Sequence, residues 1–241
     1  MNYQNLIIAH RGCWDKTHPE NSLPAFQQCV EKSVPIELDV QLSLDEEVVV
    51  FHDKNTLSLT GVSLEVEKTT FQELRKLKLS SSPAKIPTLK EVLDLVKGKV
   101  LLLIEIKRGR NFALLSRKVY DLLKNYSGEV MIQSFDIRVV WWWKKKTNYP
   151  TGLLVSSNRK LQSVFYYPIV HSVFIVDQLL NVDFVSVDFE GLTSTFISKL
   201  RKRQIPIFVW TITKPSELEF AKLYADSFIA HMARFCIDFL P

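Results

Sequence analysis

Two carboxylates and an imidazole lie close together in a stretch of the chain that is otherwise apolar. Glu37 and Asp39 belong to the β-rich run 36–42, and His52 ends the run 47–52. The polar link between the runs is too short for a parallel crossover, so it predicts an antiparallel hairpin with Glu37 roughly opposite His52. Asp39 shares the strand face of Glu37, because residues two apart point the same way. The charge density indicates a divalent cation, but a solvated polar strand face explains this stretch alone equally well.

Further residues with useful chemistry follow other apolar runs. His10 and Arg11 come directly after a short apolar run, and Glu105 and Lys107 end a dense one. Glu105 adds a third carboxylate, and carboxylate oxygens are the ligands that Mg²⁺ and Ca²⁺ prefer. His10 and His52 could divide the general base and general acid roles, while Arg11 and Lys107 could neutralise a phosphate. Together these groups have the chemistry needed to split a phosphodiester with an alcohol leaving group.

The elements that would position these residues alternate between strands and helices. Besides the hairpin arm 47–52, the hydrophobic pattern predicts strands at 6–9, 36–40, 99–107, 130–135, 152–155, 184–188, 206–212 and 227–230. The predicted helices are 23–30, 69–79, 88–96, 112–124, 137–146, 194–203 and 216–223. Residues 156–182 are apolar and aromatic with only a weak period, and they remain unassigned.

Eight parallel strands in one domain of this length are typical of a closed (β/α)₈ barrel of the TIM type. A doubly wound open sheet is the alternative. In a barrel the active site lies at the carboxyl ends of the strands. The residues that fall there are His10, Glu37, Asp39, Glu105 and Lys107. Their placement on one rim favours an active site over a solvated strand face.

These residues also belong to a set of short motifs that occur in a fixed order. The motifs are His10-Arg11-Gly12, Pro19-Glu20-Asn21-Ser22, Glu37-Leu38-Asp39-Val40, His52-Asp53, Glu105-Ile106-Lys107, Gln133-Ser134-Phe135 and Trp210-Thr211-Ile212. Each motif is weak alone, whereas the ordered set covers nearly the whole chain and is highly specific. On this set the sequence resembles the glycerophosphodiester phosphodiesterase family.

The resemblance implies a function and a set of site residues. The reaction would be the metal-dependent hydrolysis of deacylated phospholipids to sn-glycerol 3-phosphate and an alcohol. The implied residues are Glu37, Asp39 and Glu105 for a divalent metal (Mg²⁺ or Ca²⁺), His10 and His52 for acid–base catalysis, and Arg11, Lys107, Trp210 and Phe135 for substrate binding. We expect a single barrel domain over residues 1–241, with residues 54–86 as the small insertion that this family carries.

The chain departs from the family pattern at a few positions. Ser22 stands where Thr is usual, Glu46 where Gly is frequent, and Ala230-His231-Met232-Ala233 where Thr-Asp-x-Pro is common. An Arg that often follows the His-Asp pair is absent. These changes affect substrate preference more than chemistry. Two alternatives stay open: phospholipase D-like action on intact lipids, and a barrel that binds a phosphorylated ligand without catalysis.

Composition limits the partners and the compartment. The net charge of +5 favours anionic ligands. The sequence contains no zinc-finger or leucine-zipper spacing that would indicate binding to nucleic acid. Cys13, Cys29 and Cys236 form an odd set, which predicts thiols in a reducing compartment, the cytoplasm. No signal peptide and no membrane span are expected. The run 141–146, Trp-Trp-Trp-Lys-Lys-Lys, is typical of a partly buried helix with solvated lysines, and a weak membrane-surface contact is the other interpretation.

Overall fold

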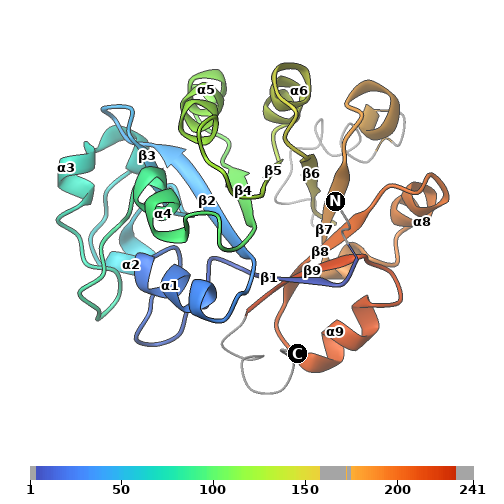
Figure 1. Cartoon of the computed structure of the whole chain (residues 1–241), viewed down its shortest axis with the longest axis horizontal. Coiled ribbons are helices and arrows are strands. Elements are labelled where there is room, and N and C mark those ends of the chain that lie inside the picture. Colours follow the sequence, from blue (N-terminus) through green and yellow to red (C-terminus); the bar gives the residue numbers. More distant parts are fainter. Residues whose placement is uncertain (1–3, 158–171, 173–174, 232–241) are drawn as a thin grey trace. The chain divides into compact units, whose positions relative to one another are not determined.

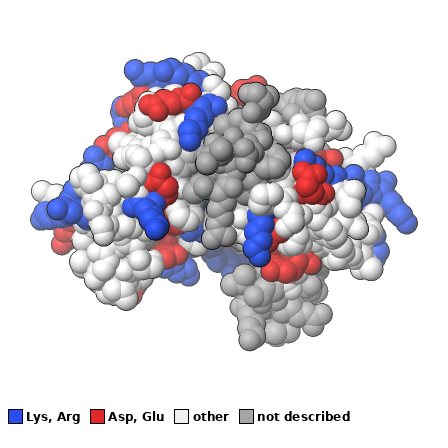
Figure 2. Space-filling view, turned by 90° about the horizontal axis from the view of Figure 1, so that it is seen from below, with Lys and Arg blue, Asp and Glu red and all other residues white. Residues whose placement is uncertain are grey.

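The structure is a computed structural model, and it describes residues 4–157, 172 and 175–231 (Figure 1). The described residues divide into two compact units, one of residues 9–130 and one of the described parts of 1–8 and 131–241. Each unit contains parallel strands with helices between them, and the unit of residues 9–130 also contains an antiparallel pair. On the face seen in Figure 2, basic and acidic side chains of the described residues are intermixed.

The unit of residues 9–130 contains the predicted hairpin. Strand β2 (Ile36–Leu42) pairs antiparallel with β3 (Val48–Val50) and parallel with β4 (Leu102–Ile106). Ala9, the last residue of β1 (Leu6–Ala9), pairs in parallel with the first residue of β2. Every residue of β2, β3 and β4 is buried, as expected for strands covered on both faces. The antiparallel hairpin is therefore confirmed.

Three longer helices of this unit start where their capping residues predict. They are α1 (Leu23–Glu31), α4 (Leu89–Val96) and α5 (Phe112–Leu123). The Ser22 hydroxyl accepts a hydrogen bond from the backbone N–H of Ala25 at the start of α1. Thr88 and Glu91 form a capping box at the start of α4, in which each side chain accepts from the other's backbone N–H. These caps satisfy donors that a helix cannot satisfy internally.

Residues 54–86 fold into short helical turns around a small core. They contain α2 (Leu57–Thr60), the 3₁₀ turn η1 (Val66–Lys68) and α3 (Phe71–Leu74). The predicted helix 69–79 is wrong in length, because α3 has only four residues. Leu74 and Leu79 both pack in the core cluster of Val49, Phe51, Val66, Leu74, Leu79 and Ile86. Residues five apart do not share a helix face, so the chain must leave the helix to bury both leucines.

The second unit continues the strand and helix alternation. Its strands β5 (Val130–Ser134, whose first residue belongs to the other unit), β6 (Thr151–Val155), β7 (Phe184–Asp188), β8 (Ile207–Ile212) and β9 (Ser227–Ala230) pair in parallel, each with the next. Its helical elements are α6 (Ile137–Lys146), the π-helix η2 (Ile175–Leu179), the 3₁₀ turn η3 (Phe189–Gly191), α8 (Thr195–Lys202) and α9 (Pro215–Ala221). Most of the unassigned stretch 156–182, and the end of the changed motif at 232–233, lie outside the described residues.

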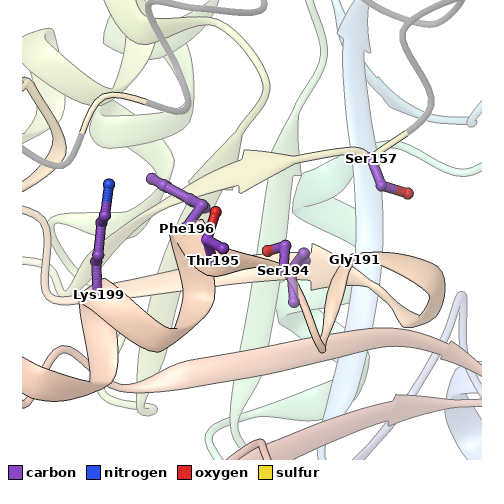
Figure 3. Close-up of a pocket in the computed structure, with 7 residues that line it drawn as sticks. Ser157, Gly191, Ser194, Thr195, Phe196 and Lys199 are labelled. Carbon is purple, nitrogen blue, oxygen red and sulfur yellow. The ribbon is translucent and has the colours of Figure 1, made fainter.

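A pocket of about 230 Å³ lies at the start of α8 in the second unit (Figure 3). Its lining residues are Ser157, Val187, Gly191, Ser194, Thr195, Phe196 and Lys199. None of them belongs to the motifs that indicate chemistry. Among the described residues, no helix is long and apolar enough to cross a membrane.

The core of residues 54–86 should contribute measurably to stability. Leu74 is fully buried in it, and Leu57 in the neighbouring helix α2 is 54% exposed. We expect Leu74→Ala to lower the free energy of unfolding by about 2–5 kcal/mol, because it leaves a cavity. Leu57→Ala should change it by about 0.5 kcal/mol or less. Urea unfolding followed by circular dichroism measures both, and equal effects of the two variants would contradict this core.

Candidate active site

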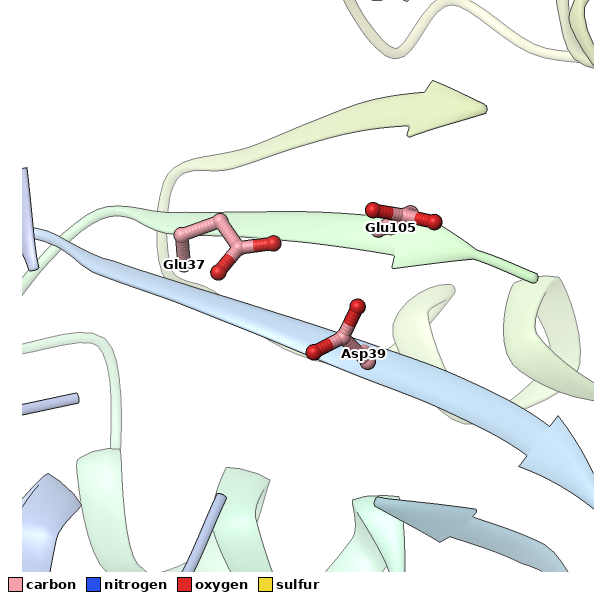
Figure 4. Close-up of side chains that lie close together, drawn as sticks. All are labelled: Glu37, Asp39 and Glu105. Atoms are coloured by element: carbon pink, nitrogen blue, oxygen red, sulfur yellow. The ribbon is translucent and has the colours of Figure 1, made fainter. Parts of the chain in front are cut away.

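Three buried carboxylates meet on two adjacent strands (Figure 4). Glu37 and Asp39 lie on β2, and Glu105 lies on β4, where it pairs in register with Asp39. Each residue offers a carboxylate oxygen, and these oxygens all lie within 4.8 Å of one another. The three residues are only 2%, 1% and 7% exposed. We call Glu37, Asp39 and Glu105 the acidic cluster.

Two cationic side chains compensate the acidic cluster. Lys107 Nζ lies 2.7 Å from Glu105 Oε1 and 3.2 Å from Asp39 Oδ1. Arg11 Nε lies 3.6 Å from Asp39 Oδ2, and the Arg11 backbone N–H donates to Glu37 Oε2 over 3.0 Å. The cations predicted to neutralise a phosphate therefore contact the carboxylates in this structure. This arrangement leaves three buried acids against two partly buried bases.

The surplus of buried acid shifts the pKa values of the cluster in opposite directions. Burial, with the nearby charges of Asp39 and Glu105, raises the pKa of Glu37 well above its usual range. Burial also acts on Asp39, but Lys107, His52 and Arg11 outweigh it and hold the pKa of Asp39 well below its usual range. Burial would lower the pKa of Lys107, yet Glu105 and Asp39 raise it overall. Burial also raises the pKa of Glu105, although Lys107 opposes this, so Glu37 and Glu105 are the less well compensated acids of the cluster.

The donor set fits a hard divalent cation. It consists of carboxylate oxygens, which suit Mg²⁺ and Ca²⁺, and it lacks the sulfur and imidazole ligands that favour softer metals. A cation would also supply the positive charge that Glu37 lacks. The acidic cluster can therefore hold a metal ion of this class.

Both predicted catalytic histidines belong to the same unit as the acidic cluster. His52 lies two residues after β3, is 32% exposed, and its Nδ1 is 2.7 Å from Asp53 Oδ1. It lies close enough to Asp39 to help hold the pKa of that carboxyl below its usual range, whereas burial raises the pKa of Glu105 overall. His10 is partly buried and precedes Arg11, whose backbone contacts the cluster directly.

The register of the hairpin differs by one residue from the predicted pairing. Val40 pairs with Val50, and the Phe51 N–H donates to the carbonyl of Asp39. The same register continued would place Leu38, and not Glu37, opposite His52. The hairpin is centred on residue 45, as predicted, and Glu46 in its turn takes a left-handed conformation (φ 64°).

Two residues that the sequence reasoning gave no role support the acidic cluster. The buried Asn21 donates from Nδ2 to Asp39 Oδ2 over 2.8 Å, and its Oδ1 accepts from the Asp39 N–H at 3.3 Å. Glu20 Oε1 accepts from Arg11 Nη1 over 2.6 Å. Both lie in the motif 19–22, which was the only sequence signal that could have identified them.

Phe135 and Trp210 lie in the second unit and contact one another. Their ring centroids are 5.6 Å apart and the rings are nearly perpendicular, at 87°. Both side chains are partly exposed. Phe135 follows β5 and Trp210 lies on β8, so the pair forms an aromatic surface between two strands of that unit.

Comparison with known proteins identifies the chain. Residues 10–232 match the glycerophosphoryl diester phosphodiesterase family. The chain belongs to this family. It is 32% identical to YhdW of Bacillus subtilis over 216 residues, which cover 86% of this chain and 85% of YhdW. The predicted family and the predicted enzymatic activity, phosphodiester hydrolysis, are confirmed by this membership.

Solved structures of related proteins show the fold. The glycerophosphodiester phosphodiesterase of Thermotoga maritima is 26% identical, with a TM-score of 0.77 and coverage of 97% of each chain. An Oleispira antarctica phosphodiesterase, solved with its product sn-glycerol 3-phosphate, is 20% identical, with a TM-score of 0.81 over 95% of this chain and 94% of its own. The predicted (β/α)₈ TIM-type barrel is thereby confirmed, and the alternative of an open sheet is wrong.

Relief of the surplus acid should be measurable without any substrate. We expect Glu37→Gln to raise the melting temperature of metal-free protein at about pH 8, because a carboxyl whose pKa is raised on folding favours the unfolded chain above the unfolded pKa. The loss in the free energy of unfolding of wild type grows as pH rises above the unfolded pKa of about 4.3. The difference in melting temperature between wild type and Glu37→Gln should therefore vanish at about pH 4. Thermal unfolding with excess chelator measures it.

Metal should reverse the order of the two proteins. Mg²⁺ or Ca²⁺ should raise the melting temperature of wild type by binding the folded state, and it should not raise that of Glu37→Gln. Glu129→Gln, at an exposed glutamate, should behave as wild type. An equal metal-induced rise in wild type and Glu37→Gln would contradict a metal at the acidic cluster.

Proposed function

We propose that the acidic cluster and its neighbours hydrolyse glycerophosphodiesters, the deacylated phospholipids, to sn-glycerol 3-phosphate and an alcohol. The observation that carries the proposal is the convergence of three buried carboxylates within 4.8 Å, in the unit that also holds both histidines and both cations. The product bound to the Oleispira phosphodiesterase supports the same product for this chain. The headgroup alcohol is the variable part of the substrate.

A divalent cation, Mg²⁺ or Ca²⁺, would be held by Glu37, Asp39 and Glu105 and would supply positive charge to the phosphate. Lys107 Nζ forms ion pairs with Asp39 Oδ1 and Glu105 Oε1. If these oxygens bound a cation, the Lys107 ammonium would be available to the phosphate. Arg11 Nε is buried and has no hydrogen-bond partner among the described residues. It can therefore donate to a phosphate oxygen.

His10 and His52 serve as the acid–base pair in this proposal. One histidine removes the proton from the attacking oxygen, and the other protonates the leaving alkoxide. The attacking oxygen belongs to water, or to the glycerol 2-hydroxyl in a first step that yields a cyclic phosphate. His52 Nδ1 is engaged by Asp53, so Nε2 is the nitrogen that exchanges the proton.

Phe135 and Trp210 are proposed to bind the glycerol moiety. The carbon skeleton of glycerol packs well on an aromatic face, and its hydroxyls need donors and acceptors. Trp210 Nε1 is buried without a hydrogen-bond partner among the described residues, so it can donate to a hydroxyl of the substrate. This orphaned donor supports a ligand role over a purely structural one.

The histidine pair gives the sharpest test of the mechanism. We expect His10→Ala and His52→Ala each to lower kcat on glycerophosphocholine by about 10²–10⁴-fold, because each removes one proton transfer. The double variant should lose less than the product of the two effects, since both groups serve one cycle. Metal-induced stabilisation should persist in both. A coupled assay for sn-glycerol 3-phosphate, with Mg²⁺, with Ca²⁺ and with chelator, measures the rates.

Two controls separate this mechanism from its alternatives. His18→Ala should keep full turnover, because His18 is bonded to Asp15 and lies outside the proposed pair. A nitrophenyl ester needs no protonation of its leaving group, so it should rescue only the variant that lacks the acid. Near-normal turnover of both pair variants on the natural diester would refute the mechanism. Full activity in chelator would refute the metal, and a preference for intact lipids would support the phospholipase D-like alternative.

We also propose a weak contact with anionic membranes at α6. Trp143 is buried, and Lys144 Nζ is paired with Asp183 at 2.8 Å, so neither is available to a membrane. Trp141 is 49% exposed and lies four residues before the exposed Lys145, on the same helix face. An exposed tryptophan next to a lysine suits the headgroup region of an anionic bilayer.

Vesicle sedimentation tests the membrane contact. Trp141→Ala and Lys145→Ala should each weaken binding to vesicles rich in an anionic lipid, by about fivefold for the lysine. Lys90→Ala, at an exposed lysine of another helix, should not. Binding that is equal on neutral and anionic vesicles, or absent in wild type, would exclude the contact.

A cytoplasmic location is proposed from the cysteines. Cys13 and Cys29 are buried thiols whose sulfur atoms are 2.7 Å apart, and they do not form a disulfide in the structure. The odd number of cysteines without paired spacing supports a reducing compartment. Cys236 lies outside the described residues. Nucleic acid is not proposed as a partner.

A further inference from the structure

The backbone on both sides of His52 is hydrogen-bonded by the side chain of Gln41, which has no role in the reaction proposed above. Gln41 lies on β2 and is 5% exposed. Its Nε2 donates to the carbonyl of Phe51 over 2.7 Å and to the carbonyl of Asp53 over 2.8 Å. These carbonyls belong to the residues on either side of His52. One amide therefore fixes the backbone on both sides of the histidine.

A second chain of hydrogen bonds fixes the ring of His52. Asp53 Oδ1 is 2.7 Å from His52 Nδ1, and Asp53 Oδ2 accepts from the Ser58 hydroxyl over 2.6 Å. Ser58 belongs to α2, within residues 54–86. Both oxygens of the carboxylate are thus oriented, one by the ring and one by α2.

The charge of Asp53 determines which ring nitrogen carries the proton. Burial would raise the pKa of Asp53, but its hydrogen bonds to Ser58 and His52 hold the pKa below the usual range, so the carboxylate stays ionised. An ionised carboxylate can only accept a hydrogen bond. His52 must then donate from Nδ1, which leaves Nε2 to exchange protons with a substrate.

We propose that Gln41 and Ser58 are positioning residues for His52, and that Ser58, from within residues 54–86, orients the Asp53 carboxylate that sets the tautomer of this catalytic histidine. Gln41 acts on the backbone, and Ser58 acts on the ring through Asp53. The proposal rests on the acid–base role given to His52 above. It assigns a catalytic purpose to a segment that would otherwise only cover the hairpin.

The first test reads the ring directly and needs no turnover. In protein labelled with ¹⁵N-histidine, the His52 signals are assigned by their loss in His52→Ala. We expect neutral His52 in wild type to carry its proton on Nδ1. Asp53→Asn can place an amide donor against Nδ1, so the proton should move to Nε2. Neutral wild-type His52 with its proton on Nε2 would overturn the proposal.

The second test separates positioning from stability. Asp53→Asn should lower kcat by about 10²-fold or more, because the proton occupies the reactive nitrogen. Ser58→Ala should lower kcat by about 3–10-fold with unchanged KM and melting temperature, the effect of one hydrogen bond. Ser58→Thr keeps the hydroxyl and should restore kcat. Ser63→Ala removes an exposed hydroxyl of the same segment that bonds only to Asn55, and it should have no effect.

The outcomes distinguish this proposal from the one on which it rests. If Ser58→Ala matches Ser63→Ala in kcat and in the His52 spectrum, the positioning role of Ser58 is excluded. If Gln41→Glu, which replaces the amide donor by an acceptor of the same size, leaves kcat unchanged in a folded protein, the role of Gln41 is excluded. Full turnover of His52→Ala would refute the acid–base role instead, and the tautomer would still report whether the network holds the ring.

Discussion

The burial of three carboxylates in one small volume is the constraint on which the rest of the unit of residues 9–130 depends. Glu37, Asp39 and Glu105 are almost completely inaccessible, and desolvation disfavours their charged forms. Arg11 and Lys107 repay part of this cost through ion pairs that are themselves largely buried. One negative charge remains in surplus. Buried carboxylates with strongly perturbed pKa values are concentrated at functional sites, and this cluster could hold a divalent cation.

The strands and loops of this unit bring the three carboxylates and the residues that contact them to one place. Strand β2 carries two carboxylates on one face, and the parallel register of β4 brings Glu105 beside Asp39. The loop after β1 brings the Arg11 backbone to Glu37, and the turn before α1 brings Asn21 to Asp39. Glu37 and Asp39 lie within β2 and Glu105 lies near the end of β4, whereas Arg11 follows β1 and Asn21 precedes α1. The strands supply the rigidity that a charge cluster needs, and the loops supply the variety of side chains.

The parts that the sequence predicts well are those encoded locally. The span of α6, the capping box of α4 and the hairpin follow from periodicity, caps and link length. The predicted length of the helix at 69–79 was wrong, because packing Leu79 into the core overrides the helical spacing of the sequence. The pairing at His52 could be predicted only to within one residue, because a pattern of apolar residues does not report the backbone geometry of the turn, where Glu46 is left-handed. Asn21 and Gln41 were missed because their partners are chosen by the folded backbone and not by sequence spacing.

Residues 51–53 link the stability of this unit to its chemistry. Phe51 is buried in the core of residues 54–86, Asp53 is bonded to Ser58 in α2, and His52 lies between them. The same packing that anchors residues 54–86 to the hairpin therefore limits the motion of the histidine. Phe51 and its neighbours stabilise the segment by apolar packing, whereas Asp53 orients the His52 ring through a hydrogen bond. A loss of packing in residues 54–86 would loosen His52 without touching any residue that contacts the substrate, because the three positions are consecutive in the chain.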